Sequence, residues 1–138
     1  MVDINPPKES LDKTHFVKCD VTSWDQQASA FQRAYDWQQR LDFVALNAGI
    51  DDRDDIFNSI SADPSKPPRE PNMLTIDVCF TAIYYGVKLG AHYLSLNSKA
   101  AGKPRPGGKI VVTASAAGIY PVILSFGYSL QLHADFIP

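Results

Sequence analysis

Cysteine and net charge are both scarce in this sequence, and each scarcity excludes a class of protein. The 138 residues include two cysteines, Cys19 and Cys79, which are too few for a disulfide framework and lie in neither a CxxC motif nor a zinc-type spacing. Thirteen Lys and Arg against fifteen Asp and Glu give a formal net charge of -2, so we expect no binding to nucleic acid or to an anionic membrane. The three histidines stand far apart along the chain, so we expect no metal site.

Long apolar runs are also lacking. No stretch approaches the roughly 18 apolar residues of a membrane span, and residues 1–7 lack the basic and apolar regions of a signal peptide. We therefore expect a cytoplasmic chain with no membrane span. With 45% hydrophobic and 20% charged residues, residues 1–138 are expected to form a single domain.

The first half of the chain has the pattern of a strand, a helix and a second strand. Residues 15–21 predict a short strand, and the capping box Ser23-x-x-Gln26 then begins a helix that runs to about residue 39. The apolar run at residues 42–49 predicts a strand buried on both faces. The residues before the first of these strands, as far as Lys13, are expected to be irregular.

The second half predicts one long helix and a further strand. A single helical stripe spans about seven turns, with Met73, Ile76, Phe80, Ile83, Val87, Ala91 and Leu94. Residues 109–113 form a β-branched strand that ends in a turn of small residues, 114–118. Strands that alternate with helices predict an α/β fold built on a parallel sheet.

Four landmarks, taken in order, resemble the short-chain dehydrogenase/reductase family. They are Cys19-Asp20-Val21, Leu46-Asn47-Ala48-Gly49, Thr113-Ala114-Ser115-Ala116-Ala117-Gly118 and Tyr128. Tyr128 follows Ser115 by thirteen residues, which is the spacing of the family's catalytic serine and tyrosine. The resemblance runs from about residue 15 to residue 134 and implies a partial Rossmann-type fold, a parallel sheet with flanking helices.

The resemblance implies a cofactor, NAD or NADP, and the residues that would contact it. Ligands of such sheets bind beyond the carboxyl ends of the strands. There, Asp20 would accept a hydrogen bond from the adenine amino group, and the backbone of Asn47, Ala48 and Gly49 would pass close to the adenosine ribose. Thr113 ends a strand at the same edge and is expected to contact the cofactor as well.

The same resemblance assigns the chemistry. Ser115 would polarise a substrate carbonyl, and Tyr128 would protonate it during hydride transfer. Two other family positions are altered. Leu132 occupies the place of the lysine in the family's Tyr-x-x-x-Lys pattern, and Cys79 occupies the place of a catalytic asparagine that in the family sits at a helix irregularity. A thiol cannot make the paired hydrogen bonds of an amide, so Cys79 is expected to be a small buried hydrophobe.

The chain also differs from the family in extent. None of its eight glycines lies in a Gly-rich turn between a first strand and its helix, so the family's first strand, phosphate-binding turn and following helix are expected to be missing, as are its last strands. The strand at residues 15–21 is then expected either to pair with residues 42–46 or to stay unpaired. The family's second strand is also expected to be missing, and with it the residues that usually decide between NAD and NADP. The choice of cofactor therefore stays open, as does the substrate.

Two functions follow from these observations. In the first, the chain belongs to an NAD(P)-dependent oxidoreductase that interconverts alcohols and ketones, with activity impaired by the altered positions. In the second, it is a truncated and inactive family member that serves in protein interaction or dimerisation through the helix at 72–97. There Gly86-x-x-x-Gly90 would allow either close approach of a second subunit or packing on the chain's own sheet.

Overall fold

The computed structural model describes residues 1–9, 12–54 and 65–115, and the chain divides into two compact units. The first unit consists of Met1–Asn47 and Ala82–Thr113, and the second of Ala48–Thr81 and Ala114–Pro138. The expectation of a single domain over residues 1–138 stays a prediction.

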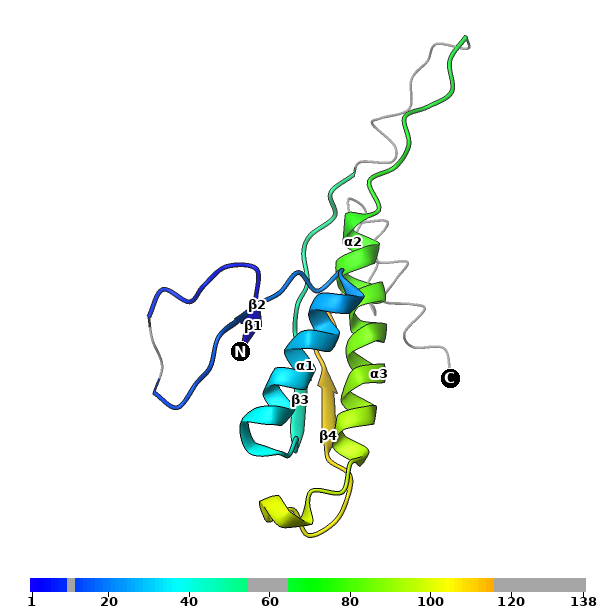
Figure 1. Cartoon of the computed structure of the whole chain (residues 1–138). Helices are drawn as coiled ribbons and strands as arrows, with labels where there is room; N and C mark the ends of the chain where they lie inside the picture. The colour runs from blue at the N-terminus through cyan, green and yellow to red at the C-terminus, as the bar shows by residue number, and fades with distance from the viewer. Residues whose placement is uncertain (10–11, 55–64, 116–138) are drawn as a thin grey trace. The chain divides into compact units, whose positions relative to one another are not determined.

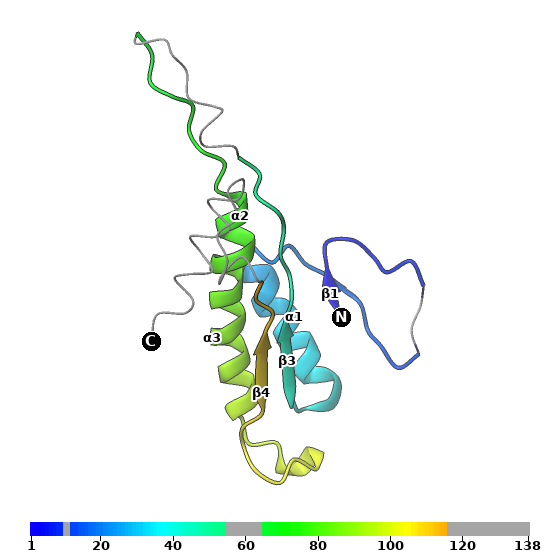
Figure 2. The ribbon, with the colours of Figure 1, turned by 180° about the vertical axis from the view of Figure 1, so that it is seen from behind.

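The first unit is built on a parallel pair of strands, β3 (Phe43–Leu46) and β4 (Lys109–Val112), aligned with Val44 opposite Ile110. Helices α1 (Trp24–Gln38) and α3 (Ala82–Ser95) lie on one face of this pair (Figures 1 and 2). Side chains alternate accordingly, because Val44 is 8% exposed and Phe43 is 54% exposed. The sequence predicts that the strand at 42–49 is buried on both faces. Among the described residues this is wrong, because they cover only one face of β3.

A second strand pair in this unit was not predicted. β1 (Val2–Asp3) pairs in parallel with β2 (Val17–Lys18), and backbone bonds continue the ladder from Val17 N to Met1 O and from Cys19 N to Asp3 O, both at 3.0 Å. The opening residues are thus not all irregular. The sequence offered two alternatives for the strand at 15–21, pairing with residues 42–46 or no pairing at all. Both are wrong, because the strand pairs with β1. A strand of two residues is too short to show a period of two.

Helix α1 begins as its sequence predicts. Ser23 is the N-cap, and its hydroxyl accepts a bond from Gln26 N at 3.4 Å. The Gln26 side chain reaches back to Asp20 N at 2.9 Å rather than to Ser23 N, so only one half of the predicted capping box has its usual form. Inside the helix, the buried Gln27 amide donates to Val21 O at 2.6 Å and to Ala82 O at 2.9 Å, which ties α1 to α3.

The long helix has three segments instead of one regular run. α2 (Leu74–Ile76) leads into a π-helical segment η1 (Asp77–Thr81), and α3 follows. The predicted apolar stripe is not the buried face, since Met73 is 50% exposed and Val87 is 38% exposed. Buried positions in the long helix include many small or polar residues, and they are Thr75, Cys79, Ala82, Gly86, Leu89, Gly90, Tyr93 and Leu94. The extra residue in the π turn shifts the helix register, which a fixed 3.6-residue period does not anticipate.

Small residues on α3 allow it to lie directly on the sheet. A Cβ atom at Gly86 would come within 2.5 Å of Leu46 Cδ2, and one at Gly90 within 3.2 Å of Ile110 Cδ1. Of the two sequence-based alternatives for these glycines, the structure therefore supports packing on the chain's own sheet.

One helix within the described residues, Leu74–Ser95, is long and apolar enough by length and composition to cross a membrane. The expectation that no such segment exists is therefore wrong on these two criteria. Close packing of Gly86 and Gly90 against β3 and β4 is what a helix in the core of a folded domain shows.

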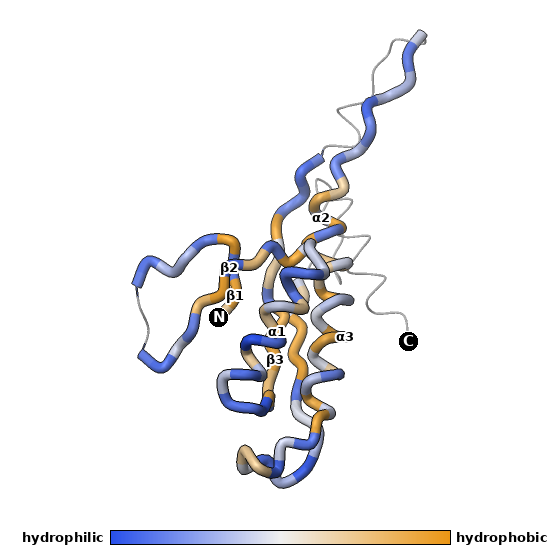
Figure 3. The backbone as a smooth tube through the Cα atoms, in the orientation of Figure 1, coloured by the Kyte–Doolittle hydropathy of each residue, from blue (hydrophilic) through white to orange (hydrophobic). Residues whose placement is uncertain are grey.

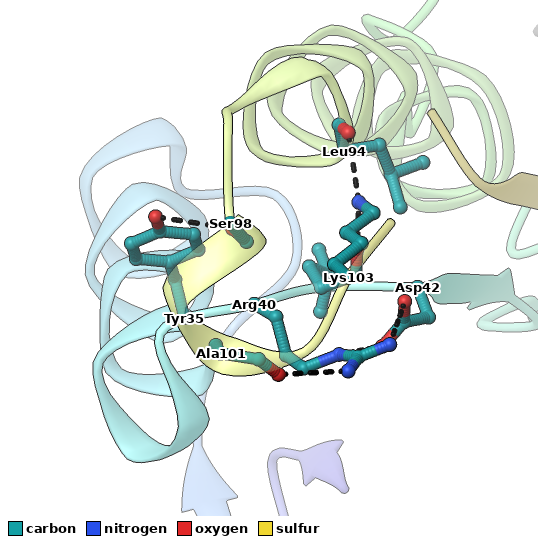
Figure 4. Close-up of polar contacts among 8 residues, drawn as sticks. Tyr35, Arg40, Asp42, Leu94, Ser98, Ala101 and Lys103 are labelled. Atoms are coloured by element: carbon teal, nitrogen blue, oxygen red, sulfur yellow. Dashed lines mark hydrogen bonds and ion pairs between the residues drawn. The ribbon is translucent and has the colours of Figure 1, made fainter. Parts of the chain in front are cut away.

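The amino ends of β3 and β4 are held by a group that we call the lysine clamp: Arg40, Asp42 and Lys103 (Figure 4). Lys103 is 4% exposed, and its ammonium donates to Leu41 O at 2.6 Å and to Leu94 O at 2.9 Å. The Arg40 guanidinium donates to both carboxylate oxygens of Asp42 at 2.8 Å and to Ala101 O at 2.9 Å. The clamp joins the turn after α1, the end of α3 and the loop before β4. The turn that follows α1 and the segment that precedes α2 are largely hydrophilic, drawn in blue in Figure 3.

Candidate functional site

The carboxyl ends of β3 and β4 are joined by two of the predicted cofactor residues. Thr113 Oγ1 donates to Asn47 Oδ1 at 2.6 Å, and Thr113 N donates to Leu46 O at 3.0 Å. Both side chains are exposed. The bond uses the side-chain oxygen of Asn47. The two N–H donors of the same amide can therefore bind a ligand. The structure thus brings Asn47 and Thr113 together at the edge where parallel α/β sheets bind ligands.

Asp20 follows β2 and forms a tight turn with Thr22. The backbone N–H and the hydroxyl of Thr22 both donate to Asp20 Oδ1, at 2.9 and 2.8 Å. Gln26 fixes the Asp20 backbone N–H, as described above, and Ser23 N donates to Asp20 O at 3.1 Å. Asp20 is exposed, and within the described residues its second carboxylate oxygen, Oδ2, has no hydrogen-bond donor. That oxygen is suitably placed to accept a bond from an amino group.

Cys19 lies directly before this turn and is completely buried. Burial, aided by the negative charge of Asp20, raises the pKa of the Cys19 thiol. The protonated thiol donates to Asp20 O at 3.5 Å. Cys19 therefore supports the turn and has the environment of an unreactive cysteine.

Two further predicted cofactor residues, Ala48 and Gly49, belong to the second unit and are exposed. A Cβ atom at Gly49 would lie 3.8 Å from Cys79 Sγ, an ordinary contact distance. Among the described residues, there is thus room for a small side chain at Gly49.

Cys79 lies in the middle of η1, so the helix irregularity expected at this position is present. Its side chain is buried, as predicted, with 7% of the residue exposed. The thiol is more than a hydrophobe, however, because Ile50 N donates to Sγ and Sγ donates to Ile50 O, both at 3.4 Å.

Of the two predicted catalytic residues, Ser115 is half-buried just beyond β4. Tyr128 lies outside the described residues, as does Leu132. The predicted pairing of Ser115 with Tyr128 therefore stays a prediction.

Sequence reasoning missed one polar residue at a strand end. Asp3 ends β1, next to β2, and one of its carboxylate oxygens accepts a bond from Asn5 N at 2.9 Å. The only sequence signal was an Asp after a single valine, which is too little to mark a strand. In the structure, Asp3 is the last residue of β1, and Asp20 follows the parallel neighbour β2. The strand beside β2, which was expected to be missing, is therefore present.

The fold and the polar carboxyl ends of its strands define a Rossmann-type α/β protein. The family model described as short chain dehydrogenase matches residues 5–130. The chain therefore belongs to the short-chain dehydrogenase/reductase family, whose members are oxidoreductases.

Relatives of this chain are described as members of the same family. The short-chain dehydrogenase/reductase prx7 of Penicillium rubens is 32% identical over 137 residues, which is 94% of this chain and 47% of the relative. The fungal relative prx6, from the same species, is 31% identical over 80% of this chain and 36% of its own length. The chain thus spans less than half the length of these relatives.

Solved structures show the same fold. The ligand-free aldohexose dehydrogenase of Thermoplasma acidophilum superposes with a TM-score of 0.72 and 23% identity, covering 97% of this chain and 46% of that protein. The structure of ElxO with NADP bound gives a TM-score of 0.66 and 21% identity over 88% of this chain and 43% of that one.

Proposed function

We propose that the chain supplies part of the cofactor site and catalytic centre of an NAD(P)-dependent oxidoreductase that interconverts alcohols and carbonyl compounds. The observation that carries this proposal is the Thr113–Asn47 bond of 2.6 Å at the carboxyl edge of β3 and β4. Asn47 would present its N–H donors to the cofactor, and Asp20 Oδ2 would accept a bond from the adenine amino group. The nicotinamide, when bound, would donate or accept the hydride.

The acid–base chemistry is assigned to Ser115 and Tyr128. Ser115 would hydrogen-bond the carbonyl oxygen of the substrate, and Tyr128 would pass it a proton. We propose that turnover is impaired, because Leu132 gives Tyr128 no ammonium and Cys79 lacks the amide of the family's asparagine.

We further propose that the cofactor is NAD rather than NADP. Rossmann-type folds use an acidic residue near the end of the second strand to bind the ribose 2′-hydroxyl of NAD. Asp3 is the acidic residue at the end of the strand that pairs with β2. A carboxylate there would repel the 2′-phosphate of NADP. The similar protein ElxO has a structure with NADP bound. The two cofactors are therefore compared on the unaltered chain and on Asp3→Asn.

A thermal melt of the chain with and without millimolar NADH or NADPH tests cofactor binding. A ligand that binds only the folded state raises the melting temperature. We expect NADH to raise it more than NADPH, and Asp3→Asn to reduce that difference. A melting temperature that neither cofactor changes would contradict the proposed function.

Activity is tested separately with Leu132→Lys, which restores the Tyr-x-x-x-Lys pattern. We expect carbonyl reduction by the unaltered chain to stay below about 1% of that of a complete family enzyme, since proton transfer typically contributes 10² or more. Leu132→Lys should raise the rate. Rapid NADH oxidation by the unaltered chain would show that the lysine is dispensable.

We also propose that the chain self-associates through the outer face of its long helix. Tyr84 is 69% exposed and Val87 is 38% exposed, one turn apart on α3, and such apolar surface is characteristic of interfaces. Tyr84→Glu should lower the molar mass measured by sedimentation, whereas Arg105→Glu, in an exposed loop, should not. A monomeric wild-type chain at high concentration would exclude this interface.

A further inference from the structure

The segment that follows Gly49 is bonded to the long helix through Thr75. Thr75 is 1% exposed, and its hydroxyl uses both of its functions on the backbone of this segment. Its Oγ1 donates to Asp51 O at 3.1 Å and accepts from Arg53 N at 3.1 Å. A buried hydroxyl that is paired in this way fixes two backbone groups at once.

Cys79, four residues further along the helix, holds the neighbouring residue in the same manner. Its thiol accepts from Ile50 N and donates to Ile50 O, both at 3.4 Å. Thr75 and Cys79 together therefore make four hydrogen bonds to the backbone of residues 50–53. We call Thr75 and Cys79 the polar seam.

The position of the seam in the helix is unusual. Asp77–Thr81 is π-helical and contains Cys79, whereas Thr75 lies in the short α-helical segment before it. Such π segments are frequently found at functional sites. At the other side of the contact, Gly49 lies against Cys79, with 3.8 Å from its ideal Cβ position to Sγ.

We propose that Thr75 and Cys79 are positioning residues that hold residues 48–53 in the conformation in which Ala48 and Gly49 can meet the cofactor. The seam acts through the backbone, and neither side chain needs to touch the ligand. This inference rests on the proposed function for the identity of the ligand. The ordering of residues 48–53 can be measured without it.

Thr75→Val and Thr75→Ser form a matched pair in the full chain. Valine keeps the shape of threonine and loses both hydrogen bonds, whereas serine keeps the hydroxyl. Hydrogen exchange measures the result: we expect the Arg53 amide to exchange about tenfold faster in Thr75→Val. The amides of residues 48–50 should also exchange faster. Thr75→Ser should stay within about twofold of the unaltered chain at these amides. Unchanged exchange in Thr75→Val would overturn the seam.

Leu89→Ala is the control for general destabilisation, because Leu89 is a buried residue of the first unit, whereas residues 48–53 belong to the second. NADH titration then separates positioning from stability. Thr75→Val should weaken NADH binding about tenfold, whereas Leu89→Ala should lower the melting temperature and leave the affinity of the folded protein unchanged. Equal loss of affinity in both variants would overturn the positioning role. If the unaltered chain does not bind NADH, the proposed function fails. The amide exchange of residues 48–53 then still shows whether the polar seam orders this segment.

Discussion

The two ends of the β3–β4 pair carry similar numbers of polar side chains but use them differently. At the amino ends, the lysine clamp directs its donors onto the chain itself, and Lys103 is buried while it does so. At the carboxyl ends, Asn47 and Thr113 are exposed and bond mainly to each other. Among the described residues, the donors of the first end bond to the chain itself, and the second end keeps exposed donors that a ligand can reach.

The difference indicates how the fold separates stability from function. Burial makes the two Lys103 bonds of the clamp matter for folding, because a carbonyl left without a donor in the interior is costly. Exposure makes the Asn47–Thr113 bond weak for folding but leaves the pair accessible. We therefore expect substitutions at the amino end to lower stability and substitutions at the carboxyl end to lower cofactor affinity.

Lys103→Met gives the largest expected effect. Methionine fills much of the space of the lysine stem but cannot donate to Leu41 O or Leu94 O. We expect the free energy of unfolding to fall by about 3 kcal/mol, since one buried and one part-buried carbonyl lose a charged donor. Denaturant titration measures the change.

Lys99→Met is the matched control, because Lys99 is exposed in the same loop. It should change the free energy of unfolding by no more than about 0.5 kcal/mol. If both lysine variants had the same stability, the clamp would contribute nothing, and the comparison of the two ends would fail.

Two glycines extend the comparison from side chains to the backbone. A Cβ atom at Gly108, just before β4, would lie 2.6 Å from Asp42 O, a backbone atom that cannot easily move. Gly108→Ala should therefore cost about 2 kcal/mol of unfolding free energy. Gly49→Ala, with 3.8 Å to the nearest atom, should change stability by no more than about 0.5 kcal/mol. Similar stability losses in both variants would show that a side chain at Gly49 meets a close neighbour.

The sequence predicted the parts of this comparison that depend on local pattern. The N-cap at Ser23, the strands around Val44 and Ile110, and the placement of Asn47 and Thr113 at strand ends followed from periodicity, capping and resemblance. Neighbouring residues along the chain carry these signals, so they can be found without coordinates.

The parts that depend on distant partners could not be predicted. Lys103 lies 62 residues from Leu41, and nothing near it in sequence marks it as buried. The strand at Val2–Asp3 is defined only by its pairing with β2. In the long helix, the π turn at Asp77–Thr81 changes the register, so the buried face is not the most apolar one.

Thr113→Val tests the carboxyl end. It removes the donor to Asn47 Oδ1 while keeping a β-branched side chain at the end of β4. Because both residues are exposed, unfolding free energy should fall by about 0.5 kcal/mol or less. NADH affinity should fall about fivefold, because the Asn47 amide is no longer oriented. Thr113→Ser should restore both values, and an affinity loss that serine does not restore would assign the effect to the methyl group.

Asp42→Asn has the smallest expected effect and a defined pH dependence. The hydrogen bond from Arg40, aided by the positive charges of Arg40 and Lys103, holds the pKa of Asp42 below its ordinary value. A carboxylate whose pKa is lowered on folding stabilises the fold above its unfolded pKa of about 4. This contribution is lost as the pH falls through the lower, folded pKa of Asp42.

The Arg40–Asp42 pair is exposed, so Asp42→Asn should lower the melting temperature by about 2 °C or less at pH 7. That difference should stay constant from pH 7 to pH 5 and shrink below pH 4. A difference that instead grew on acidification would show that Asp42 is not stabilised as the carboxylate, and that the clamp depends on Lys103 alone.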